Sequence, residues 1–247
     1  MNVQVTGPKI YFKINIGSLE IPFTETMLCM LVVSAFILIV CLWLASGLKK
    51  VPKGKQVLAE KLVSYFYGMV EETMGRHNLH FAPYIGTLFM FSIVGSLSSL
   101  VGMRPYTANL SVTLTFALMT SIMVWFRSIK TNGFFGWLKS FVDPVPVILP
   151  LNIISEVANP VSMAFRHFGN VAAGTIISAL VYSALAGLSN TVLGWIPNDF
   201  IANIPIFQLG LPAILSIYFD VFSSYLQAFI ICTLTMVYVG GAGPEGD

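Results

Sequence analysis

NIISEVANPVSMAFRHFGNVAAGTII, residues 152–177, is the most informative stretch of this chain, because it sets ionisable and amide side chains inside a long apolar run. Arg166 is its most costly member. An arginine at the centre of a helix in lipid costs about 2.5–3.5 kcal/mol on insertion scales, and a guanidinium does not escape by deprotonation. Either Arg166 snorkels from a helix end, or it faces a partner, a water-filled pocket or a protein surface. The apolar run continues well beyond Arg166, which favours the second interpretation.

The composition is that of a polytopic α-helical membrane protein. Of the 247 residues, 56% are hydrophobic and only 10% are charged, whereas soluble domains carry about 25% charged residues. A net charge of +2 without a dense basic run gives no indication of a nucleic-acid partner. The cysteines lie far apart in apolar runs (Cys29, Cys41, Cys232), so we interpret them as small buried hydrophobes. We assign no metal and no cofactor.

Hydropathy predicts an all-α fold in one integral-membrane domain, residues 1–247, with about five transmembrane helices. An uncharged run of about 22 residues is long enough to span the hydrocarbon core, and an amphipathic stretch after it is expected to lie on the membrane surface. The expected order is an outer N-terminal segment at 1–26, the first span at 27–48, the amphipathic helix at 56–75, the second and third spans at 83–126, and a pair of long tilted helices at 145–240.

The distribution of basic residues predicts the orientation. Most of the 13 Lys and Arg residues fall in the segments that follow Leu48 and Phe126. Loops rich in Lys and Arg stay in the cytoplasm. We therefore expect the N-terminus outside and the C-terminus in the cytoplasm.

The two C-terminal runs are too long for perpendicular spans, at 1.5 Å per helical residue. The first must tilt steeply, bend at Pro160 or lie partly across the membrane. Helical spacing of 100° per residue gives each run one polar stripe. Arg166 and Asn170 share one stripe, and Asp220, Ser223, Ser224 and Gln227 share the other. Small residues between them allow the two helices to approach closely.

Each of these polar residues has a second interpretation. Glu156 ends a helix near the cytoplasmic interface, or it lines a water-filled path. Asn170 and Gln227 are part of an ion path, or they are hydrogen bonds between helices. His167 points about 100° away from Arg166 and is expected to face headgroups or another helix. Asp220 has no nearby base, which argues against a plain surface role.

Three segments in order resemble subunit a of F-type ATP synthases. PVSMAFRHFGNVAAG, residues 160–174, is similar to the family signature of a Pro–small pair, Arg-x-Phe-Gly-Asn and a run of small residues. YLQAFI at 225–230 resembles its Leu-Gln-Ala-Phe segment, and PYTANLSVT at 105–113 resembles its Pro-Thr-Ala-Asp-x-Asn-Val-Thr turn. The N-terminal third resembles the family in hydropathy only.

The resemblance implies a mechanism and partners. Arg166 would face an acidic side chain on each passing c-subunit, help that carboxylate to release its ion, and block a direct leak between two offset half-channels. The chain would act without catalysis of its own, in a bacterial cell membrane, with the c-ring, subunit b of the peripheral stalk and, through the complex, the soluble ATPase sector. The implied ion path comprises Glu156, Asn170, Thr175, Asp220, Ser224 and Gln227. The sequence does not distinguish H⁺ from Na⁺.

The chain departs from one common pattern of the resembled family. Thr175 stands where many relatives have Glu, and Asp220 stands at the position of a His, seven residues before Gln227. A carboxylate is therefore expected to replace that His in the outer half-channel. Asn109 also stands where the family often has Asp.

Two other classes of function remain to be weighed. A secondary transporter or ion channel that works alone usually has an internal repeat, and none is seen in this sequence. A membrane scaffold would not need Arg166 deep in an apolar helix.

Overall fold

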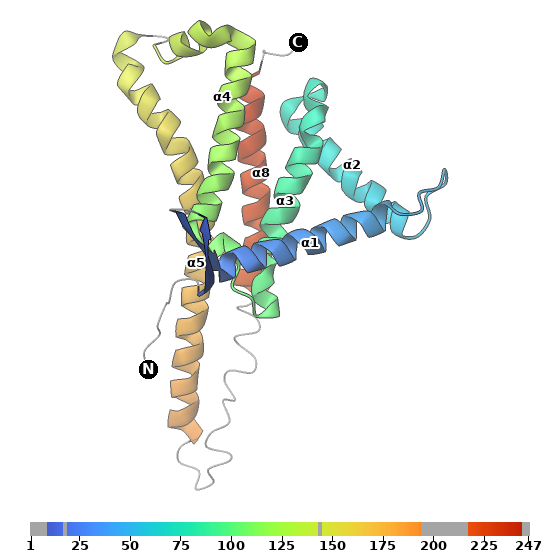
Figure 1. Ribbon diagram of the computed structural model, residues 1–247, viewed down its shortest axis with the longest axis vertical. Helices are drawn as coiled ribbons and strands as arrows, with labels where there is room; N and C mark the ends of the chain where they lie inside the picture. The colour runs from blue at the N-terminus through green and yellow to red at the C-terminus, as the bar shows by residue number, and fades with distance from the viewer. Residues whose placement is uncertain (1–8, 17–18, 143–144, 194–216, 244–247) are drawn as a thin grey trace.

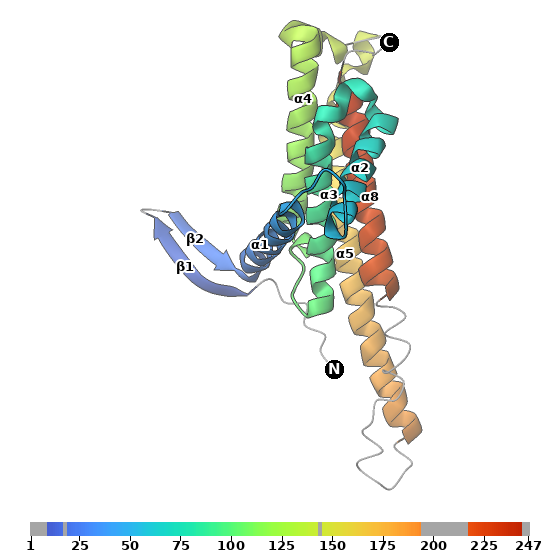
Figure 2. The ribbon, with the colours of Figure 1, turned by 90° about the vertical axis from the view of Figure 1, so that its right-hand side faces the viewer.

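The computed structural model describes residues 9–16, 19–142, 145–193 and 217–243, which form a helical bundle with one small β-hairpin (Figures 1 and 2). Among these residues, five helical segments are long and apolar enough to cross a membrane: Glu25–Ala45, Arg76–Val101, Leu110–Ser140, Pro146–Ser189 and Asp220–Gly241. The predicted all-α polytopic fold with about five spans is confirmed.

The N-terminal hairpin was not predicted. Strand β1, Ile10–Ile16, pairs with β2, Leu19–Thr24, in an antiparallel arrangement. The segment has the alternation of apolar and polar residues that is typical of strands. Helix α1, Glu25–Ala45, begins directly after β2.

Helix α1 indicates how the bundle sits in a membrane. Its 21 residues extend about 31 Å at 1.5 Å per residue, which matches the hydrocarbon thickness only when the helix stands near the membrane normal. In Figure 1, α1 points at a large angle to the direction of α4, α5 and α8, and in Figure 2 it is foreshortened while those helices keep their direction. The long C-terminal helices thus lie at a large angle to the first span, and the predicted tilt in the membrane stays a prediction.

Helix α2, Lys55–Met74, coincides with the expected amphipathic helix, and its buried side chains include Phe66, Val70 and Met74. The 3₁₀-helix η1, Arg76–Phe81, leads into α3, Ala82–Leu97. Two short 3₁₀ turns, η2 (Ser98–Val101) and η3 (Tyr106–Ala108), then connect α3 to α4.

Helix α4, Leu110–Ser140, is longer than the expected third span, which was taken to end at Phe126. Asn109 caps its start, since the Asn109 side chain accepts a hydrogen bond from the Ser111 backbone N–H at 3.1 Å. The helix is interrupted at Gly133, whose φ of 71° lies in the left-handed region that favours glycine. The part after Gly133 contains Trp137.

The C-terminal pair consists of α5 and α8. After the turn η4, Pro146–Ile148, helix α5 runs from Leu149 to Leu193 and contains Pro160. Its N-terminal part leans away from α4 in Figure 1, whereas the rest follows the long axis of the bundle. A proline inside a helix removes one backbone donor and favours such a bend. The π-helix η6, Ile217–Phe222, leads into α8, Ser223–Gly241; residues 206–216 of the expected last run lie outside the described residues.

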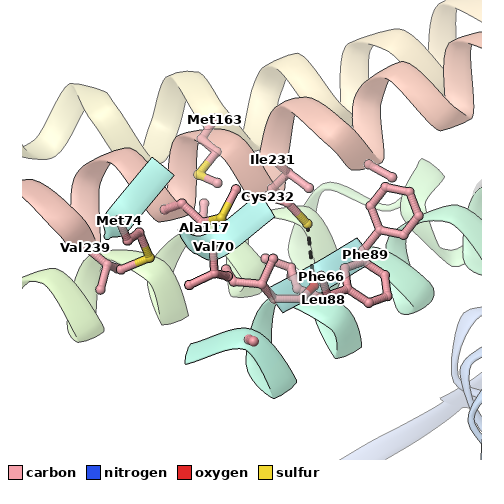
Figure 3. Packing of buried hydrophobic residues seen from close by; sticks show 14 of the residues in the cluster. Phe66, Val70, Met74, Leu88, Phe89, Ala117, Met163, Ile231, Cys232 and Val239 are labelled. Atoms are coloured by element: carbon pink, nitrogen blue, oxygen red, sulfur yellow. Dashed lines mark hydrogen bonds between the residues drawn. The ribbon is translucent and has the colours of Figure 1, made fainter. Parts of the chain in front are cut away.

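One apolar cluster joins α2, α3, α4, α5 and α8 (Figure 3). It includes Val70, Leu88, Ala117, Met163 and Ile231, all of them buried. Within it, the Cys232 thiol lies 3.7 Å from the Ile85 carbonyl oxygen, which accepts its hydrogen bond. Cys29 and Cys232 are buried as expected, whereas Cys41 is exposed.

Candidate functional site

Arg166 lies in the middle of α5 with an exposed side chain. Within the described residues it has no hydrogen bond and no ion pair. Its neighbour His167 is fully buried, and neither ring nitrogen has a hydrogen-bond partner among those residues. The helix thus turns the permanent cation outward and the imidazole inward. His167 faces the bundle, which is one of the two surroundings expected for it.

Asn170 lies one turn after Arg166 and connects α5 to α8. The Ser223 hydroxyl donates a hydrogen bond to Asn170 Oδ1 at 2.8 Å. The structure therefore joins the two polar stripes that the sequence placed on separate helices, four residues beyond the arginine.

Asp220 lies in the π-helix η6 just before this junction. The Ser99 hydroxyl, in the 3₁₀ turn η2 that follows α3, donates to Asp220 Oδ1 at 3.2 Å. A small polar pocket lies here, with room for about one water molecule (≈ 10 Å³). It is lined by Ser96, Ser99, Pro105, Asn170, Val171, Gly174, Asp220, Ser223 and Ser224. Ser96, Ser99 and the π-helix were not identified from the sequence, because no local pattern marks them.

Glu156 lies ten residues before Arg166 on α5, between two larger pockets. The indole N–H of Trp125, on α4, donates to its carboxylate. One pocket, of about 140 Å³, is lined by Thr120, Ser121, Val124, Glu156, Asn159, Pro160, Met163 and Tyr238. The other, of about 340 Å³, includes Ser128, Ser140, Asn152, Ser155 and Glu156. Trp125 was also missed, since an aromatic residue near a helix end has an ordinary interfacial interpretation.

The pockets are offset along α5, with Arg166 between them in sequence. Glu156, Asn159 and Met163 line one side, and Asn170, Val171 and Gly174 line the other. His167, between these positions in the sequence, is buried, and so are Thr120, which lines the first pocket, and its hydroxyl partner Thr235 at 3.1 Å. The two pockets are therefore separate, they flank Arg166 along the sequence of α5, and Arg166 lines neither of them.

The remaining predicted residues are placed as follows. Ser224 and Gln227 are buried in α8, at 5% and 4% exposure, and Ser224 also lines the small pocket. Gln227 lies deeper in the helix than that pocket. Thr175 lies in α5, but its side chain falls outside the described part of the structure.

Comparisons with known proteins agree with one another. The family model described as "ATP synthase A chain" matches residues 27–240. The chain is 29% identical over 269 residues to "ATP synthase subunit a, sodium ion specific" of Propionigenium modestum. This alignment covers 96% of the chain and 86% of that protein. It is 31% identical to "ATP synthase subunit a" of Moorella thermoacetica, over 76% of this chain and 77% of the relative. It is also 31% identical to the protein of that name from Streptococcus equi subsp. zooepidemicus, over 92% of this chain and 94% of the relative.

Proposed function

Because this chain belongs to the ATP synthase subunit a family, we propose that Arg166 is the fixed cation beside which each carboxylate of a rotating c-ring releases its ion. The chain has the ion-translocating role of this family in the membrane sector of an F-type complex. The exposed guanidinium of Arg166, without a partner among the described residues, carries the proposal. A stand-alone transporter or channel is not favoured.

The chemistry follows from the charge of the arginine. A carboxylate that moves through lipid is expected to be protonated or ion-loaded, because desolvation raises its pKa. A fixed guanidinium nearby favours the ionised form, so the carboxylate releases its ion there. The same cation repels an ion that would pass directly from one path to the other. Glycine and alanine near Arg166, Gly169 and Ala173, leave space for a partner helix.

The two groups of pockets support two half-channels. We assign Glu156 and the pockets beside it to the inner path, and Asn170, Asp220 and Ser224 to the outer path, with Gln227 and Thr175 deeper along it. The carboxylate of Asp220 then serves as the hydrating or titrating group. The proposed partners are the c-ring, subunit b and, through the complex, the soluble ATPase sector.

The decisive test is substitution of Arg166 in the assembled complex. Arg166→Ala should abolish ATP synthesis and ATP-driven pumping and leave a passive leak. Arg166→Lys keeps the charge but loses the planar five-donor group, so it should also fail to support synthesis. Ion pumping is followed by fluorescence in inverted vesicles, with and without Na⁺ to identify the ion. Subunit content is checked by immunoblot, and Lys130→Ala, at another exposed basic residue, is the control. Normal pumping by a fully assembled Arg166→Ala complex would exclude this role.

The proposed orientation has the N-terminus outside and the C-terminus in the cytoplasm. It is supported by the basic residues after Leu48 and Phe126. Single cysteines at positions 9 and 53 in a cysteine-free background test it with a membrane-impermeant reagent added from outside. Labelling only at position 9 is expected, and the reverse pattern would contradict the orientation.

A further inference from the structure

The β1–β2 hairpin has one apolar and one polar face. The pairing sets Phe12 opposite Phe23, residue 14 opposite 21, and residue 16 opposite 19. Opposed residues share a face, and successive residues alternate between faces. One face therefore carries Phe, Ile, Ile, Leu, Ile and Phe at positions 12, 14, 16, 19, 21 and 23. The other carries Lys, Asn, Glu and Pro at positions 13, 15, 20 and 22, and the register shift between Ile10 and Phe12 leaves Tyr11 outside this alternation.

The described side chains agree with this division. The Phe12 and Phe23 rings are stacked, with centroids 4.6 Å apart and planes 9° from parallel. Lys13 Nζ lies 2.8 Å from Glu20 Oε2. Phe12 is 53% exposed although it belongs to the apolar face. The hairpin therefore presents aromatic surface that the rest of the described chain does not cover.

The hairpin is held at the end of the first span. Strand β2 ends at Thr24 and α1 begins at Glu25, so no linker separates them. The backbone N–H of Glu25 also donates to the carbonyl of Lys9 at 2.9 Å, which ties the start of the hairpin to the same point. In Figure 2, where α1 is foreshortened, the hairpin extends sideways from it, away from α3, α5 and α8.

This geometry determines the direction of the hairpin in a membrane. Because α1 must stand near the membrane normal to span the hydrocarbon core, a hairpin that extends sideways from its end runs along the membrane surface. The first turns of α1 expose Met27, Leu28 and Leu31. The apolar face of the hairpin is thus adjacent to apolar surface that already meets lipid.

We propose that the hairpin is an interfacial anchor, with the face of residues 12, 14, 16, 19, 21 and 23 lying on the lipid leaflet at which α1 begins. Two strands alone are marginally stable in water, and an open sheet edge is not tolerated within hydrocarbon. Neither problem arises at the boundary between lipid headgroups and acyl chains. There, lipid covers the apolar face, and water forms hydrogen bonds with the strand edges and with Lys13 and Glu20. This inference requires only that α1 crosses the membrane, and it is independent of the role proposed for Arg166.

Spin labels on adjacent residues test the proposal. Single cysteines replace Phe12, Lys13, Ile21 or Pro22 in a background that lacks Cys29, Cys41 and Cys232, and the assembled complex is placed in phosphatidylcholine vesicles. Collision with oxygen, which concentrates in hydrocarbon, is compared with collision with a water-soluble nickel chelate. The ratio of oxygen collisions to nickel collisions should be higher at positions 12 and 21, on the apolar face, than at positions 13 and 22, on the polar face.

Two results would overturn the proposal. Equal nickel access on both faces would place the hairpin in water, and protection of positions 12 and 21 from both reagents would show that another protein covers them. Amide hydrogen exchange of the unsubstituted chain in the same vesicles is the second measurement. Slow exchange is expected for the amides that pair β1 with β2, and exchange of these amides as fast as in an unstructured peptide would overturn the proposal whatever the cysteine variants show.

Discussion

Ser223 and Asn170 form the direct polar link between the two C-terminal helices, with Ser223 Oγ donating to Asn170 Oδ1 at 2.8 Å. The link lies one helical turn from Arg166, and both residues line the small pocket that contains Asp220. This hydrogen bond thus connects the helix that carries the cation to the helix that follows the acidic group.

Removal of this link should weaken coupling without abolishing it. Ser223→Ala deletes the donor to Asn170, and hydrogen bonds between membrane helices contribute roughly 0.6 kcal/mol on average. We therefore expect ATP-driven pumping to fall roughly two- to threefold, with normal assembly. Ser111→Ala, which removes an exposed hydroxyl of α4, is the matched control. An unchanged pumping rate in Ser223→Ala would show that the link does not position Asn170.

Gly95 makes room for Tyr106 at the end of α3. A Cβ at Gly95 would lie 2.2 Å from Tyr106 Cζ, and the Tyr106 hydroxyl donates to the Phe91 carbonyl at 2.6 Å. Gly95→Ala should lower stability by about 1–3 kcal/mol, as expected for overpacking, and disturb the adjacent Pro105 that lines the Asp220 pocket.

Thermal unfolding in detergent measures this effect. Gly187→Ala, where a Cβ would meet nothing within 4 Å, is the control. Tyr106→Leu, with a shorter side chain, should restore part of the stability lost in Gly95→Ala. Equal melting temperatures for the two glycine variants would contradict the prediction.

Much of this organisation was predictable from the sequence, because span lengths and charged loops depend on local hydropathy. The contacts of the site were not, because they join residues far apart in the chain. Ser99 meets Asp220 across 121 positions, and nothing near Ser99 in the sequence distinguishes it from the neighbouring serines of α3 and η2. The π-helix at Asp220 is likewise invisible to a search for 3.6-residue periodicity.

Arg127 illustrates why α4 continues beyond Phe126, where the third span was expected to end. A basic residue after an apolar run indicates the end of a span. In the structure, however, Arg127 Nη2 donates to Asn78 Oδ1 at 2.6 Å, and the guanidinium carbon lies 5.2 Å from the centre of the Phe81 ring. These contacts, from a segment almost fifty residues earlier, hold Arg127 inside a continuous helix.

Arg127 should therefore contribute to stability. Arg127→Ala removes a charged hydrogen bond and a cation–π contact. We expect the free energy of unfolding to fall by about 2 kcal/mol. Arg127→Lys should recover only part of this, because it lacks the planar group that stacks on Phe81. Thermal unfolding with Lys130→Ala as control measures both variants. A melting temperature unaffected by Arg127→Ala would show that the cluster does not stabilise the bundle.

Asp220 provides the most direct test of the outer path. Asp220→Asn retains an oxygen that can accept from Ser99 but removes the negative charge, so the pocket should keep its shape and lose its carboxylate. We expect ATP synthesis to fall while the complex assembles normally, whereas Ser99→Ala, which keeps the charge, should have a smaller effect. Glu72→Gln, at an exposed acid of α2, controls for loss of one charge. Synthesis and ion flux are measured in vesicles at several pH values. A wild-type rate and wild-type pH dependence in Asp220→Asn would remove Asp220 from the path and leave the outer half-channel to the amide and hydroxyl groups of Asn170, Ser223 and Ser224.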